Sequence, residues 1–198
     1  MSVQNAPHED HFRAGKALGL EHVKLGMWLF IGSEVMFFGG LIAAFLHYKV
    51  NNPSPIETAL LDVVLVGINT FILLSSSFTV VLGLSSIQRD DRSGLIRYLS
   101  LTAILGSVFL AGQVYEFFAL YQEGVTLSSS VFGSSFFTLT GFHGLHVLIG
   151  VGWALGTLLK AARGGYSSTN NIGVEIFGLY WHFVDVVWIV LFTIIYLI

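Results

Sequence analysis

Two histidines three residues apart, His143 and His146, have the type and spacing of side chains that can hold a metal ion. Positions i and i+3 of a helix share a face, and His182 could add a third ligand, with Asp185 or Glu34 as a fourth. Two imidazoles alone are an incomplete site, and hydrogen bonds to neighbouring helices would satisfy them equally well. We therefore expect structural histidines and no metal, with a His-ligated site as the alternative.

Glu34 is an acidic residue within an apolar stretch, roughly 14 Å along a helix from Leu25 at the standard rise per residue. That distance places its carboxyl group near the middle of a bilayer, where a charge without a partner costs several kcal/mol. One interpretation is a proton-exchanging acid that reacts with carbodiimides. The other is a protonated glutamate that hydrogen-bonds a neighbouring helix.

The last apolar stretch carries three ionisable side chains, Glu175, His182 and Asp185, within about three helical turns. Helical periodicity puts them on one face, which cannot point at lipid, so another helix must provide a polar lining opposite it. His182 and Asp185 could form a charge-assisted pair at i and i+3. Glu175 falls in the first turn, where the helix dipole favours its negative charge.

Small and neutral polar residues mark expected contacts between helices. Gly32, Gly40 and Gly144 would let another backbone approach, and Asn69 would hydrogen-bond across an interface. Gln113 and Glu116 lie one turn apart near the expected outer surface. For these two we expect an interfacial contact or a hydrogen bond to a partner.

The elements that must position these residues are transmembrane helices. The chain has 198 residues, 54% of them hydrophobic and only 11% charged, with a mean hydropathy of +0.76. Such a composition is typical of an integral membrane protein. None of the apolar stretches alternates with a period of two, so we predict an all-α, polytopic bundle of five helices at about 25–47, 59–87, 95–121, 131–159 and 173–198.

The positive charges predict the orientation. Eight of the nine Lys and Arg residues fall on one side of the predicted spans and Lys49 alone falls on the other. By the positive-inside rule the N-terminus is cytoplasmic and the C-terminus lies outside. Residues 1–21 form a polar tail without the features of a signal peptide, and residues 22–198 form one transmembrane domain.

Composition also excludes several classes of function. The chain has no cysteine, which rules out disulfides, iron–sulfur clusters and Cys-ligated zinc in it. Its net charge of −3 and scattered basic residues provide no patch for nucleic acid.

Five ordered sequence blocks resemble subunit III of the haem-copper terminal oxidases, from about residue 24 to the C-terminus. The strongest are FIGSEVMFF (30–38), GFHGLHV (141–147) and YWHFVDVVW (180–188), and the weaker ones are INTFILLSS (68–76) and QVYEFF (113–118). Their common order is far more specific than any single block.

The resemblance implies a non-catalytic subunit of a proton-pumping oxidase in the aerobic respiratory chain of a bacterial cell membrane. Such a subunit carries no redox centre of its own; haem and copper reside in its partners. It docks on subunit I, with subunit II and small subunits nearby, stabilises subunit I, supports its proton uptake and binds phospholipid. Glu34 matches the carbodiimide-reactive glutamate of the family, and other matches to its internal polar residues are His143, His146, Glu175, His182 and Asp185.

Two features bear on the particular oxidase. Longer family members have two extra N-terminal helices that this chain lacks, so the lipid-holding cleft would need a wall from another subunit. A five-helix length is typical of quinol oxidases, whereas the Ser-Glu-Val and Gly-Phe-His blocks favour cytochrome c oxidases. We expect a cytochrome c oxidase, with a quinol oxidase as the alternative and membership of a respiratory supercomplex open.

Two functions of other classes remain open on the residues alone. A membrane-embedded metalloenzyme would use His143, His146 and His182. A proton or solute carrier would be built around Glu34.

Overall fold

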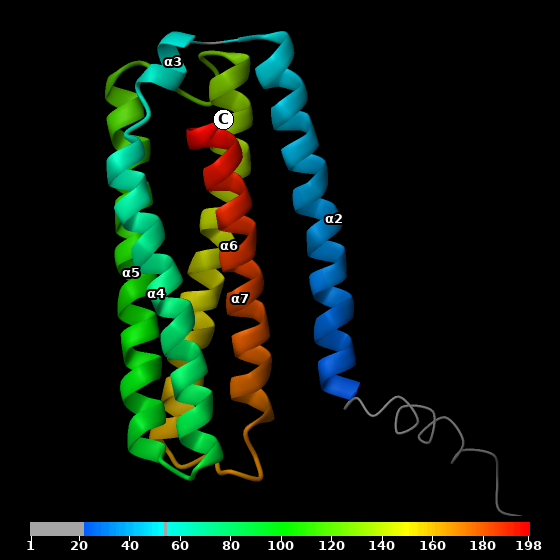
Figure 1. Cartoon of the computed structure of the whole chain (residues 1–198), viewed down its shortest axis with the longest axis vertical. Coiled ribbons are helices and arrows are strands. Elements are labelled where there is room, and N and C mark those ends of the chain that lie inside the picture. The colour runs from blue at the N-terminus through cyan, green and yellow to red at the C-terminus, as the bar shows by residue number, and fades with distance from the viewer. Residues whose placement is uncertain (1–21, 54) are drawn as a thin grey trace, which may run out of the picture.

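The computed structural model describes residues 22–53 and 55–198, which form an almost entirely helical chain (Figure 1). The predicted polar tail, with Arg13 and Lys16, lies outside these residues. The elements are α2 (His22–Asn51), α3 (Pro55–Ala59), α4 (Val63–Gln88), α5 (Arg92–Gln122), α6 (Val131–Ala162) and α7 (Ile172–Phe192), which continues into a π-helical turn, η1 (Thr193–Leu197).

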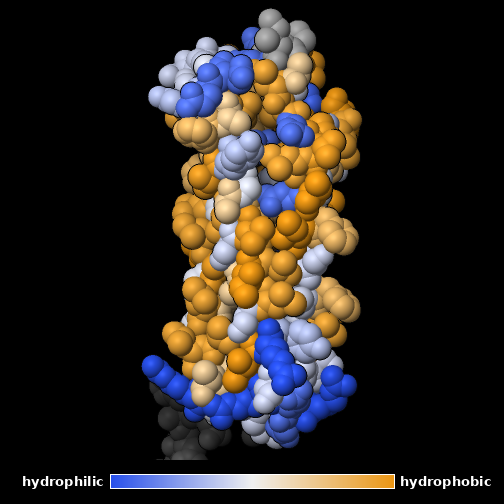
Figure 2. Space-filling view, turned by 90° about the vertical axis from the view of Figure 1, so that its left-hand side faces the viewer, coloured by the Kyte–Doolittle hydropathy of each residue, from blue (hydrophilic) through white to orange (hydrophobic). Residues whose placement is uncertain are grey.

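Five of these helices are long and apolar enough to cross a membrane, which confirms the predicted all-α, multi-pass fold. They are α2, α4, α5, α6 and α7 with η1, and each contains most of one predicted span. Figure 2 shows a broad apolar band along the side of the molecule, with hydrophilic residues gathered at both ends. This distribution fits a bundle whose middle lies in hydrocarbon.

The helices α4 to α7 form a bundle, and α2 stands at its edge (Figure 1). α2 packs against α6 and α7, whereas α7 contacts α2, α4 and α6. Consequently α2 is the least buried of the five spans and α7 the most buried. Since lipid tails are as apolar as the side chains, close packing and hydrogen bonds between helices stabilise this arrangement.

Aromatic side chains of α7 occupy the centre of the bundle. Trp181 is fully buried, and its ring lies between Gly106 of α5 and Gly150 of α6. A Cβ atom at either glycine would come within 2.7 Å of that ring. The two glycines therefore make room for the indole, so three helices meet around one side chain.

Side chains cap the N-terminal ends of three of the spans. Asp62 accepts a hydrogen bond from the backbone N–H of Leu65, and Ser130 accepts one from Gly133, each at 2.9 Å. Asp91 caps α5 in the same way. These caps satisfy backbone donors that the first helical turn leaves free.

The α4–α5 turn and the α6–α7 loop are tied together at one end of the bundle. Asp90 has a left-handed backbone with a φ of 58° and accepts hydrogen bonds from the backbone N–H and the hydroxyl of Ser168, both at 2.7 Å. Arg92 donates from Nε to the carbonyl oxygen of Ala161 at 2.8 Å and from a terminal nitrogen to that of Ala162. It thus caps the C-terminal end of α6, where carbonyl groups lack helical partners.

Basic residues gather at that end, to which the described part of the chain contributes Lys24, Arg89, Arg92, Arg97, Lys160 and Arg163. Lys49 lies at the opposite end, where its Nζ donates to the carbonyl oxygen of Ile194 in η1 at 2.9 Å. The charges are therefore divided between the ends as the sequence predicts. The cytoplasmic location of the basic end stays a prediction.

Candidate functional site

A contact between an imidazole and a carboxyl group joins α2 to α6 within the apolar band. Nε2 of His146 lies 3.3 Å from a carboxyl oxygen of Glu34, and the two side chains are 13% and 19% exposed. Nδ1 of the same histidine lies 2.7 Å from the carbonyl oxygen of Phe142, which can only accept a hydrogen bond. Nδ1 therefore carries a hydrogen, and a bond between Nε2 and Glu34 requires one further proton, on either group.

α7 supports this pair through the backbone of α6. The hydroxyl of Tyr180 donates to the carbonyl oxygen of His146 at 2.9 Å. The ring of Phe38 packs edge-on against the imidazole, with 5.0 Å between the ring centres. The pair is thus held between three helices while part of each side chain remains accessible.

The neighbouring histidine, His143, has a different environment. It is fully buried, and its ring stacks on Trp188 with 4.8 Å between the centres and 25° between the planes. Phe109 packs edge-on against it, and neither ring nitrogen has a hydrogen-bond partner in the described chain. His143 therefore serves the aromatic core, while His146 faces Glu34.

α4 provides the polar lining opposite α7. The indole N–H of Trp188 donates to the hydroxyl of Thr70 at 2.9 Å, and that of Trp181 donates to Ser76 at 2.8 Å. His182 Nδ1 lies 2.5 Å from the hydroxyl oxygen of Ser77. Thr70, Ser76 and Ser77 of α4 thus each offer a hydroxyl group to α7, and the two buried indole N–H groups are satisfied without a charge.

Asp185 does not form the charge-assisted pair with His182 that the sequence suggested. Its carboxyl group is 3% exposed and no hydrogen bond of standard geometry reaches it within the described residues. His182 binds Ser77 because α4 presents this serine hydroxyl to the same face of α7.

Glu175 was expected to share this polar face, and its polar partner comes from α2 instead of α4. Its carboxylate pairs with Lys24 of α2 at 2.8 Å, with both side chains about one-third exposed or less. Gly178 instead lies against Val80 of α4. The face of α7 therefore turns from α2 at its first turn to α4 further along, and Glu175 belongs to the basic end of the bundle.

The described histidines and carboxylates do not gather into a metal site. His146 faces Glu34, His182 faces Ser77 and His143 stacks on Trp188, each against a different neighbour. Within residues 22–53 and 55–198 no group of three or more His, Asp or Glu side chains could hold a metal ion. The arrangement can hold protons and hydrogen bonds, which is the chemistry that its geometry supports.

Two of the residues expected at helix contacts lie at close approaches. A Cβ atom at Gly144 would come within 2.7 Å of the amide of Gln113, and Asn69 donates to the carbonyl oxygen of Phe109 at 2.9 Å. Gly32 and Gly40 differ, because a Cβ atom at either would meet nothing within 4 Å. α2 turns this side away from the described helices, so the expected contact within the chain is absent there.

Glu116 was expected near the outer surface, but the structure buries its carboxyl group near the end of the bundle opposite the basic one. Glu116 of α5 is only 6% exposed and accepts a hydrogen bond at 2.7 Å from the hydroxyl of Tyr196 in η1. Gln113, one turn earlier, donates to the carbonyl oxygen of Thr140 at 2.7 Å. The i, i+3 spacing was the available signal, since it turns both side chains towards neighbouring helices and away from partners.

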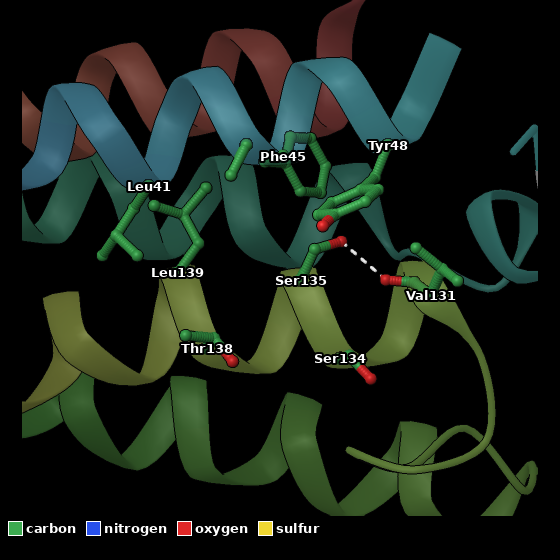
Figure 3. A pocket seen from close by; sticks show the side chains of 9 residues that line it. Leu41, Phe45, Tyr48, Val131, Ser134, Ser135, Thr138 and Leu139 are labelled. Carbon is green, nitrogen blue, oxygen red and sulfur yellow. Dashed lines mark hydrogen bonds between the residues drawn. The ribbon is translucent and has the colours of Figure 1, made fainter. Parts of the chain in front are cut away.

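A groove of about 360 Å³ lies between α2 and α6 near the same end (Figure 3). Leu41, Phe45 and Leu139 line one part of it, and the hydroxyl groups of Tyr48 and Ser135 lie at another (Figure 3). Ser135 is already bonded to the carbonyl oxygen of Val131 at 2.9 Å. The groove is predominantly apolar.

The fold and the side chains define a multi-pass helical membrane protein with protonatable groups buried at helix interfaces. The sequence profile of the family described as cytochrome c oxidase subunit III matches residues 8–198. The chain belongs to this family, whose members are subunits of haem-copper oxidases in bacterial membranes. Subunits of this family carry no redox cofactor themselves and act as parts of an oxidase complex.

Individual relatives cover nearly the whole chain. Cytochrome c oxidase subunit 3 of Thermostichus vulcanus is 41% identical over 92% of this chain and 94% of its own length. Its counterpart in Synechocystis is 46% identical over 87% of this chain and 74% of its own length. Quinol oxidase subunit 3 of Bacillus subtilis is 38% identical over 98% of this chain and 93% of its own length. Similarity therefore extends to both kinds of oxidase.

Proposed function

We propose that this chain docks on subunit I of a proton-pumping cytochrome c oxidase, stabilises it and supports its proton uptake. Haem and copper reside in the partner subunits, subunit II and small subunits complete the complex, and phospholipid fills the gaps between them. The family membership over residues 8–198 is the observation that carries the proposal. The basic end of the bundle faces the cytoplasm in this arrangement.

The Glu34–His146 pair is the part of the chain best suited to proton uptake. It holds a proton between two groups within the membrane and stays partly accessible. His143, His182 and Asp185 add buried groups deeper in the bundle, whereas Glu175 anchors α2 at the basic end. The proposal gives Glu34 the reactivity towards carbodiimides and gives this chain no catalytic residue.

Lipid has two places in this proposal. One is the cleft that two N-terminal helices line in the longer members of the family. The other is the groove beside Phe45 and Tyr48, whose apolar lining suits an acyl chain.

Purification through a tag on this chain tests the proposed role. The complex should show the visible spectrum of haem and contain copper, and the chain released by detergent should retain neither. Metal that stays with the released chain and is lost in His182→Ala would instead favour a metalloenzyme. Proton transport by the released chain alone in vesicles would favour a carrier.

Electron donation separates the two kinds of oxidase. We propose cytochrome c as the donor on the strength of the Ser-Glu-Val and Gly-Phe-His blocks around Glu34 and His143. The purified complex should oxidise reduced cytochrome c in the presence of oxygen and leave a reduced quinol unchanged. The reverse result would identify a quinol oxidase, as the relative from Bacillus subtilis is named.

A further inference from the structure

Ser77 lies at a junction that neither the sequence motifs nor the proposed role explains. Its hydroxyl oxygen is 2.5 Å from Nδ1 of His182. Asp185 follows one turn further along α7, and its two carboxyl oxygens are buried with no hydrogen-bond partner in the described chain. A hydroxyl group, an imidazole and a buried carboxyl group therefore lie along about one turn of the α4–α7 interface.

Asp185 has the environment of a neutral acid. It is 3% exposed, and neither carboxyl oxygen accepts a hydrogen bond of standard geometry in the described chain. A carboxylate without donors is costly in hydrocarbon, and a hydrogen on one oxygen removes the charge and supplies a donor. Ser77 of α4, which contacts His182 one turn away, offers a hydroxyl oxygen as an acceptor for that hydrogen.

No charged group on α4 competes for this proton, because its sequence from Val63 to Gln88 contains no ionisable side chain. The buried groups on the other helices are engaged elsewhere. Glu34 of α2 pairs with His146 of α6, and Glu116 of α5 binds Tyr196. His143 of α6 stacks on Trp188.

We propose that Asp185, Ser77 and His182 form a single proton-binding site between α4 and α7. Asp185 carries the proton and donates to Ser77 Oγ, whose own hydrogen is donated to Nδ1 of His182. His182 is then neutral, with its hydrogen on Nε2. Moving both hydrogens along the chain would transfer the proton to His182 and leave Asp185 as a carboxylate, so the site can pass a proton across one helical turn without gaining net charge.

This inference goes beyond the proposed oxidase role and does not depend on the electron donor. Infrared difference spectra of the purified complex, recorded between acidic and alkaline pH, would detect the carboxylic acid of Asp185 by its C=O stretching band. We expect the band to disappear in Asp185→Asn. In Ser77→Ala it should shift, because the acid loses its acceptor.

Two control variants make the assignment specific. Ser75→Ala removes a hydroxyl on the same helix that bonds only to the carbonyl oxygen of Phe71, and it should leave the band unchanged. Glu34→Gln should remove only the contribution of Glu34 to the difference spectrum and leave the Asp185 band in place. A spectrum of Asp185→Asn identical to that of the parent complex, or a band insensitive to Ser77→Ala, would overturn the proposal.

Nitrogen NMR of the labelled complex provides a second readout if Asp185→Asn fails to assemble. His182 should show the neutral tautomer with hydrogen on Nε2, and its Nδ1 resonance should move in Ser77→Ala but not in Ser75→Ala. A hydrogen on Nδ1 of His182 in the parent complex would contradict the proposed direction of the hydrogen bonds.

Discussion

Two of the interfaces that contain ionisable groups, α2–α6 and α4–α7, are built differently. Between α2 and α6, Glu34 and His146 face each other as a partly exposed pair. α2, which carries Glu34, stands at the edge of the bundle. Between α4 and α7, neutral hydrogen bonds dominate, and the one carboxyl group, Asp185, is almost fully buried. At the α2–α6 interface each ionisable group has a partner, whereas at the closely packed α4–α7 interface most hydrogen bonds join neutral groups.

This difference assigns separate tasks to the two interfaces. The α4–α7 interface fixes the position of the most buried helix through hydroxyl groups of α4, so its loss should damage the whole fold. The α2–α6 interface adds a helix with few neighbours, and its pair is partly exposed. We therefore expect stability to depend chiefly on the first interface, and the proposed reactivity belongs to the second.

The largest expected effect comes from truncating the side chain at the centre of the bundle. Trp181→Ala would remove a fully buried ring and its bond to Ser76, which should destabilise the subunit by about 3–5 kcal/mol. Trp28→Ala is the matched control, because Trp28 of α2 is 52% exposed. Thermal unfolding of the purified complex would measure both, and equal losses would contradict the division between the interfaces.

A smaller loss should follow from adding a single methyl group beside the same ring. In Gly106→Ala the new Cβ atom would lie 2.7 Å from Cη2 of Trp181 and 2.9 Å from Cγ2 of Val151, at a cost of about 1–3 kcal/mol. Gly40→Ala on α2 should cost nothing within this chain, because nothing lies within 4 Å. A strong loss of assembly in Gly40→Ala would instead reveal a partner subunit against that face.

Glu34→Gln should separate reactivity from assembly. The amide can donate to Nε2 of His146 in place of the acid, so we expect a change in stability below about 1 kcal/mol and an intact complex. Labelling by a hydrophobic carbodiimide should fall to background, as mass spectrometry of the subunit would show. Glu123→Gln, on an exposed acid, should leave labelling unchanged. Complete loss of the complex in Glu34→Gln would show that the pair is structural.

The smallest effect belongs to the loops, outside both interfaces. Hydrogen bonds from Ser168 lower the pKa of Asp90 below its ordinary value of 3.8. Because the folded pKa is the lower one, the stabilisation is present above about pH 4 and is lost as the pH falls through the folded pKa.

Ser168→Ala should flatten this slight acid dependence by removing the hydroxyl donor, whereas Ser167→Ala should preserve it. Unfolding measured between pH 3 and pH 6 would distinguish the variants, with the range chosen around the usual aspartate pKa of about 3.9. An unchanged slope in Ser168→Ala would mean that the backbone N–H alone holds Asp90.

Most of the fold could be predicted because hydrophobic length alone defines a membrane span. The predicted spans overlap all five helices, and their ends differ by a few residues where caps such as Asp62 and Ser130 set the first turn. Contacts between helices were less predictable. Periodicity shows which residues share a face of one helix, but it does not show which other helix packs against that face.

The differences between expected and observed contacts at the site have that origin. Glu175 and His182 share a face by spacing alone, yet α2 meets the first and α4 meets the second. Gly32 and Gly40 are small residues of the kind found at helix contacts, but they lie on the side of α2 that faces away from the other described helices. The bond between Glu116 and Tyr196 joins positions 80 residues apart, which no local pattern can indicate.

The contacts of α2 have a consequence for synthesis of the protein. α2 precedes the other described spans, but its neighbours α6 and α7 follow last, and α6 begins 80 residues after α2 ends. At roughly 5–20 residues per second, translation needs about 4–16 s to reach the start of α6. During this interval the carboxyl group of Glu34 lies in the bilayer without His146. It must then carry a hydrogen or meet water or another protein, because a lone charge is costly in hydrocarbon.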